Sequence, residues 1–283
     1  DGRISEAEKQ AMRKLIEKRS GKPKGPTNPS KPMNAPAKPG PSAGFPDGAN
    51  CLFIGHSFFV PVARSFDALA TASDFPDHQA QLVFSPGQGG SPGQLWENPE
   101  QKKKIEAILA TGEIELFGMT VVANQGTIED YNRWINLALK YNPKTKIMIG
   151  QYWMASGPNL KDEQFEMLTE MLAEQSFEDV EELRRTYPNR IYFVHYGHVG
   201  PEMKTQFSAG NLPDIQQLVG LGKDSLFRDN KIGHAGPLMH ELCALTWTAT
   251  LYQAGLKDVN HSDFSDQAAA IARSAIQNNQ QYR

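Results

Sequence analysis

The sequence predicts an α/β protein, a three-layer α/β/α sandwich built around a mainly parallel, five-stranded sheet. Three observations lead to this prediction. Strand-like apolar runs alternate with helix-like runs after residue 50, no internal repeat is apparent, and the 283-residue chain is 39% hydrophobic, which is enough for one large core. Strands that alternate with helices are joined by right-handed crossovers, so neighbouring strands run parallel.

Two segments precede this domain. In residues 1–19, Asp1-Gly2 followed by Glu8 matches the second half of an EF-hand calcium loop, and a helical pattern follows. A capping box formed by Ser5 and Glu8 explains the same residues, and both interpretations stay open. The early acidic ligands are missing, so we expect no more than weak calcium binding by Asp1 and Glu8. Residues 20–49 are rich in Pro, Gly, Lys and Ser and predict an extended linker.

The predicted domain covers residues 50–260 and contains five strands and five main helices. The helix over residues 128–141 keeps apolar side chains at helical spacing and ends before Asn142-Pro143, a stop signal. The other helices are assigned in the same way between the strands, and residues 261–283 predict a polar tail that frays from Ser274. The expected strands are 51–54, 81–84, 115–123, 146–152 and 190–195, and the helices are 62–71, 95–110, 128–141, 163–187 and 237–254.

Composition narrows the function classes. The formal net charge of −3 argues against nucleic acid or an anionic membrane as the main partner. There is no run of about 18 apolar residues, so we expect no membrane span. Cys51 and Cys243 fall in a predicted strand and a predicted helix, which favours two buried, unpaired thiols over a disulfide. The cysteines therefore do not settle the cellular compartment.

Candidate functional residues follow the ends of the first three strands. Ser57 lies in Gly55-His56-Ser57, between a buried strand and a helix, where open α/β sheets place ligands. A helix cap is the simpler explanation of this serine. Gly90 lies in a glycine-rich loop whose N–H groups can hold an anion, and Asn124 offers an amide donor. A flexible loop would explain Gly90 equally well, and a turn would explain Asn124.

Later segments supply further candidates. Trp153, with its neighbour Tyr152, can line a pocket or pack in the core. His195 ends the fifth strand and His198 follows it, but no acidic cluster joins them in sequence, so a metal pair is not favoured. The loop before the last helix contains an Asp upstream of His234, and an Asp in this position can orient an imidazole. Asp229 is the first candidate for that acid, and Asp224 is the reserve.

The order Ser57, Gly90, Asn124 and Asp229…His234 resembles the SGNH (GDSL-like) hydrolase family over roughly residues 50–256. Ile54-Gly55-His56-Ser57 matches the first block, with His56 where Asp or Asn is commoner. The third block departs most, since Val122-Ala123-Asn124-Gln125 replaces Gly-x-Asn-Asp. Asp229 and His234 are separated by four residues, where two are usual in the family.

The resemblance implies a flavodoxin-like sheet and a serine ester hydrolase that needs no metal or organic cofactor. Ser57, His234 and Asp229 would be the catalytic residues. The Ser57 N–H, the Gly90 N–H and the Asn124 side chain would hold the oxyanion. The expected substrate is a small ester or an acylated carbohydrate that loses a short group such as acetyl. His56, Trp153 and His198 would line the site, with Tyr152 and Trp96 nearby.

A secreted or periplasmic bacterial protein would suit this activity, and the oligomeric state stays unknown. Two alternatives remain. The first is a non-catalytic glycan-binding or scaffold domain of the same fold, suggested by the irregular third block and the wider Asp–His spacing. The second is a lyase or transferase that uses His195 or His198.

Overall fold

The computed structural model describes residues 44–121 and 127–282. Its main sheet has the strand order β2-β1-β3-β4-β5, and every neighbouring pair is parallel. This sheet, with helices on both faces, confirms the predicted three-layer α/β/α fold and its flavodoxin-like strand order. The strands are β1 (Asn50–Gly55), β2 (Gln79–Phe84), β3 (Leu116–Thr120), β4 (Lys146–Gln151) and β5 (Ile191–His195).

Burial explains why these runs form a parallel sheet. All five residues of β3 and of β5 are buried, as a strand covered on both faces requires. Strand β2 lies at the edge of the sheet and has mostly exposed or half-buried residues. Gly118 in β3 lies directly against the ring of Phe53 in β1. A Cβ at this position would lie 2.3 Å from the phenylalanine ring, so a larger residue would not fit.

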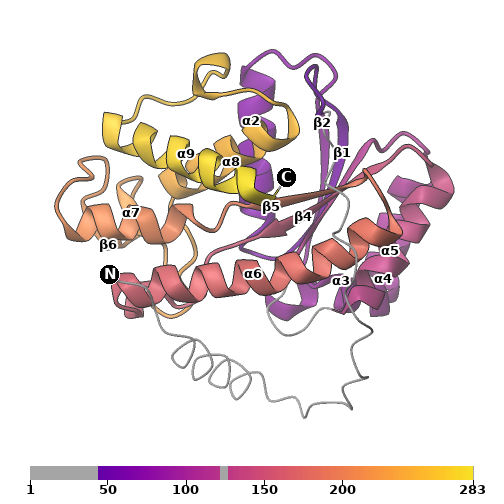
Figure 1. Cartoon of the computed structure of the whole chain (residues 1–283), viewed down its shortest axis with the longest axis horizontal. Coiled ribbons are helices and arrows are strands. Elements are labelled where there is room, and N and C mark those ends of the chain that lie inside the picture. Colours follow the sequence, from indigo (N-terminus) through magenta and orange to yellow (C-terminus); the bar gives the residue numbers. More distant parts are fainter. Residues whose placement is uncertain (1–43, 122–126, 283) are drawn as a thin grey trace, which may run out of the picture.

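Two layers of helices cover the sheet (Figure 1). One layer contains α2 (Val60–Ala72), α8 (Pro237–Leu251) and α9 (Asp266–Asn279), which pack in that order. In the other layer, α5 (Ile128–Tyr141) packs between α6 (Asp162–Thr186) and the pair formed by α3 (Pro92–Glu97) and α4 (Pro99–Leu109). Helix α7 (Val199–Ser208) follows β5 and contacts α6, α8 and α9. The remaining short elements are η1 (Gly87–Gly90), η2 (Gly157–Asn159), β6 (Gln217–Val219), β7 (Ser225–Phe227), η3 (Leu256–Asp258) and η4 (Gln280–Tyr282).

The helix expected over 95–110 is two helices, α3 (Pro92–Glu97) and α4 (Pro99–Leu109). The break occurs at Asn98, which has an extended backbone and caps α4 by accepting hydrogen bonds from the N–H groups of Glu100 and Gln101. Because proline disfavours a helical conformation in the residue before it, Pro99 explains this break.

The C-terminal segment is more ordered than its polar composition predicts. The expected fraying from Ser274 is wrong, because Ser274 lies inside α9. Ala268, Ile271 and Ala275 are buried in this helix, and α9 packs on α8. The small apolar residues of this segment recur at helical spacing and indicate a packed helix, although the overall composition of the segment is polar.

The two cysteines are confirmed as buried and unpaired. Burial raises the pKa of the Cys51 thiol to about 12, so this thiol stays protonated. Within residues 44–121 and 127–282, no helix is long and apolar enough to cross a lipid bilayer.

Candidate active site

Ser57, His234 and Asp229 meet at the carboxyl end of the sheet although they lie far apart in the chain. The His234 Nε2 atom is 2.8 Å from the Ser57 Oγ atom. On the other side of the ring, His234 Nδ1 is 2.6 Å from Asp229 Oδ2. A hydroxyl bonded to an imidazole that a carboxylate orients is the arrangement that turns serine into a nucleophile.

Ser57 lies in the tight turn that joins β1 to α2. The N–H groups of Phe59 and Val60 both donate to the carbonyl of His56, and the Tyr196 hydroxyl donates to the carbonyl of Phe58 at 3.0 Å. Helix α2 begins at Val60, and no side chain caps its first turn. Ser57 is therefore not a helix cap, and its hydroxyl faces His234 instead.

Asp229 organises the loop that presents His234. Its Oδ1 atom accepts hydrogen bonds from the N–H groups of Lys231, Ile232 and Gly233, and its Oδ2 atom accepts one from the N–H of His234. Burial acts to raise the pKa of the Asp229 carboxyl, but these bonds and the His234 ring together hold it well below its usual range. The acid paired with His234 is thus Asp229, and the reserve candidate Asp224 is not the ring's partner.

A second set of contacts holds the loop against the sheet. The Trp153 indole N–H donates to the carbonyl of Gly233 at 2.9 Å, and the N–H of Ser156 donates to that of Ile232. Gly233 has φ +80°, a conformation that favours glycine, and a Cβ there would lie 2.8 Å from Pro158. The side chain of Trp153 is fully buried, so this residue supports the loop from below and does not line a cleft.

Gly90 lies directly against the segment that carries Ser57. A Cβ at Gly90 would lie 2.6 Å from the backbone of Gly55 and from both the backbone and the side chain of His56. Only glycine therefore allows this approach. The following Ser91 accepts a hydrogen bond from the N–H of Gln94, which confirms Ser91-Pro92 as the start of a helix. Asn124 lies outside the described residues, as do Asp1 and Glu8.

His56 is 4% exposed and so does not form an open wall of the site. Its Nδ1 atom accepts from the N–H of Phe58 at 3.2 Å, and its ring packs edge-on against Tyr152. Burial lowers the pKa of His56 to about 4, against a smaller raising effect of the Val121 carbonyl. The imidazole is therefore neutral at pH 7.

Two other expected lining residues lie elsewhere. His198 contacts Glu170, Glu202 and Asn278 beyond the end of β5, and Trp96 packs on Trp134 between α3 and α5. The structure instead places Phe58 beside His234, with the two ring centroids 5.3 Å apart. Tyr196 and Phe58 were missed because neither carries a motif signal, and their contact joins β5 to the turn after β1.

No family model matches the chain, and no curated protein matches it in sequence. Among solved structures, a DUF4886 family protein from Bacteroides uniformis is similar at 14% identity and a TM-score of 0.52, over 81% of this chain and 95% of that one. This likeness shows a shared fold.

Two other structures match at lower TM-scores. The periplasmic domain of a lipopolysaccharide acetyltransferase from Salmonella ser. Paratyphi A has a TM-score of 0.43 and 10% identity, over 72% of this chain and 83% of that one. A gut microbial diltiazem-metabolizing enzyme has a TM-score of 0.40 and 13% identity, over 76% of this chain and 48% of that one.

Proposed function

We propose that the protein is a serine ester hydrolase that uses Ser57, His234 and Asp229. The observation that carries this proposal is the continuous contact from Asp229 Oδ2 through both ring nitrogens of His234 to Ser57 Oγ, at 2.6 Å and 2.8 Å. A helix cap or a surface histidine, the simpler explanations of these residues taken singly, would not require this alignment.

The reaction follows from the direction of these contacts. His234 Nε2 accepts the hydroxyl proton while Ser57 Oγ bonds to the acyl carbon, and the carbonyl oxygen becomes an oxyanion. The ionised Asp229 stabilises the imidazolium and fixes its tautomer. The proton then passes to the leaving alcohol, and a water molecule repeats the sequence to release the acid and free Ser57.

The proposed oxyanion donors are the N–H groups of Ser57 and Gly90 and the Asn124 side chain. The packing of Gly90 against the peptide before Ser57 supports the first two as neighbours. Loss of one such donor typically raises the barrier by about 3 kcal/mol.

We further propose short acyl groups, such as acetyl on carbohydrate or another small ester, as substrates. The His234 and Asp229 side chains are 31% and 33% exposed, so an ester on a bulky carrier can reach them. The predicted secreted or periplasmic location stays a prediction.

Ester turnover by the wild type, Ser57→Ala and the matched control Ser65→Ala tests the proposal. We expect a series of nitrophenyl esters and acetylated glycans to be hydrolysed with a preference for short acyl groups. Ser57→Ala should lose this activity, and Ser65→Ala should keep it. Turnover unchanged in Ser57→Ala would refute the proposed nucleophile.

Labelling with a fluorophosphonate separates this proposal from the non-catalytic alternative. An activated Ser57 should be labelled in the wild type and unlabelled in Ser57→Ala. If the wild type resists labelling and hydrolyses none of the esters but still binds glycans, a glycan-binding domain of the same fold is the better explanation.

A further inference from the structure

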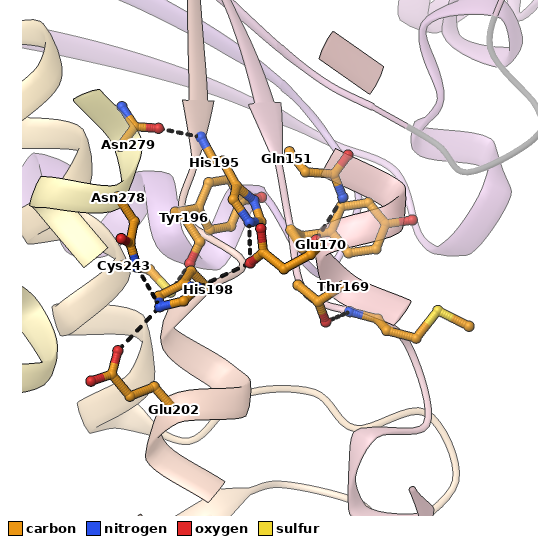
Figure 2. A network of polar contacts seen from close by, with 12 residues as sticks. Gln151, Thr169, Glu170, His195, Tyr196, His198, Glu202, Cys243, Asn278 and Asn279 are labelled. Atoms are coloured by element: carbon orange, nitrogen blue, oxygen red, sulfur yellow. Dashed lines mark hydrogen bonds and ion pairs between the residues drawn. The ribbon is translucent and has the colours of Figure 1, made fainter. Parts of the chain in front are cut away.

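A second cluster of chemically active side chains lies at the carboxyl end of β5. His195 is the last residue of this strand, His198 precedes α7, and Glu170 reaches them from α6 (Figure 2). The sequence offered no acidic partner for the two histidines, because Glu170 lies 25 residues upstream of His195 and on another element. Strand β5 is three strands from β1, so this cluster is about 14 Å along the sheet edge from the Ser57 turn.

The three side chains converge on a small volume. Glu170 Oε1 lies 3.1 Å from His195 Nε2 and 3.0 Å from His198 Nδ1, and all three atoms lie within 4.8 Å of one another. Ligand bonds of about 2.1 Å at tetrahedral angles place neighbouring ligand atoms about 3.4 Å apart. The two distances from Glu170 Oε1 are already close to this spacing. To bind one ion, the site would need mainly a change in the distance between His195 Nε2 and His198 Nδ1.

The surrounding residues orient these ligand atoms. His195 is 1% exposed, and its backbone N–H donates to Asn279 Oδ1 at 2.7 Å. The far nitrogen of His198, Nε2, lies 3.2 Å from a Glu202 carboxylate oxygen and 2.7 Å from the Asn278 amide. Histidines that bind metal commonly have their other ring nitrogen paired with a carboxylate in this way.

Solvent can reach one side of the cluster. An open hollow of about 270 Å³ lies beside His198 and Glu202, and Glu166, Thr205 and Gln206 are among its other lining residues. The Glu170 side chain is 33% exposed, so solvent also reaches the carboxylate of the ligand set, and a water molecule would be at hand as a further ligand. Three protein ligands with one open position are common in zinc proteins.

We propose that Glu170, His195 and His198 form a binding site for a divalent transition-metal ion, with zinc as the best fit to two imidazoles and one carboxylate. Mg²⁺ and Ca²⁺ prefer all-oxygen ligand sets, so they fit these donors less well. The ion would join α6, β5 and the start of α7. It would also fix the segment containing Tyr196, whose hydroxyl holds the carbonyl of Phe58.

Without an ion, the same groups would form an ion-paired network. Burial acts to lower the pKa of His198, but Glu170 and Glu202 raise it to about 9, so the ring would carry a proton at pH 7. The alternative to the proposal is a purely structural ion-pair network, and zinc binding by the chain separates the two possibilities.

Zinc titration of the purified, chelator-treated chain tests the site. Isothermal titration with ZnCl₂, and metal analysis after gel filtration, should show one zinc ion per chain. Cobalt(II) should give the visible absorption of a low-coordinate site. Stoichiometric zinc binding should be lost in Glu170→Gln and in His198→Asn, and Glu202→Gln should weaken binding roughly 10-fold or more.

Two kinds of control keep the result specific. His261→Asn and Glu166→Gln change a histidine and a glutamate outside the ligand set, and both should bind zinc as the wild type does. Ser57→Ala should also bind zinc normally, so failure of the esterase proposal would not affect this one. A wild type that retains no zinc would overturn the proposal, as would unchanged binding in a folded His198→Asn variant.

Discussion

Acid should destabilise this protein through His56. The ring is buried and neutral in the folded protein, where its pKa is lowered from 6.5 to about 4. An unfolded chain takes up the proton near pH 6.5, so this contribution to stability is present above pH 6.5 and is lost as the pH falls towards 4. Integrating between these two pKa values gives a loss of about 2 kcal/mol at pH 5 and about 3 kcal/mol at pH 4.

The assay is urea unfolding followed by tryptophan fluorescence at pH 7 and pH 5, for the wild type and His56→Asn. Asparagine does not titrate, and its side-chain oxygen can accept from the Phe58 N–H as His56 Nδ1 does. Other acid-sensitive groups, such as the partly buried His240, remain in both proteins. The wild type should lose about 2 kcal/mol more than the variant between these pH values. Equal losses would refute the argument.

Two further predictions concern the triad and its support. Asp229→Asn should lower kcat for ester hydrolysis by about 10³- to 10⁴-fold, because an amide cannot stabilise the imidazolium or fix its tautomer, whereas Asp224→Asn should change kcat little. Comparable losses in the two variants would argue against Asp229 as the orienting acid. Gly90→Ala should lower the free energy of unfolding by about 1–3 kcal/mol and reduce ester turnover, because its Cβ would meet the backbone before Ser57 at 2.6 Å. Gly255→Ala, with only an ordinary contact at 3.5 Å, is the control, and equal unfolding free energies in the two variants would contradict the packing argument.

The strands and the layer arrangement could be predicted because they depend on local patterns. Each expected strand is present, and α5 has the predicted bounds, with a capping box at Thr127 and Asp130 and an end before Asn142-Pro143. The pairing of Ser57 with His234 could be anticipated, because Ser57 follows the end of a predicted strand and His234 lies just before a predicted helix. The choice of Asp229 over Asp224 could not, since it depends on how the loop folds around one carboxylate.

The rest of the site depends on contacts between distant segments, which no local sequence pattern predicts. Trp153 was expected at a cleft, but its indole supports the His234 loop from the core. Glu170 lies in the middle of α6, where an acidic residue usually faces solvent, and only the packing of α6 on β5 brings it to the two histidines. Side chains that act through distant partners in this way need the assembled fold to reveal them.

The two carboxylate oxygens of Asp229 have different partners, and together they shape the loop as well as orient His234. One oxygen gathers three successive backbone N–H groups, while the other binds the imidazole, so the same carboxylate that orients the ring also shapes the chain leading to it. The residues between Asp229 and His234 are therefore ordered by the acid itself. A loop that forms around Asp229 delivers His234 already aligned, so side-chain changes at residues 230–232 should matter less than a change at Gly233, whose backbone conformation favours glycine.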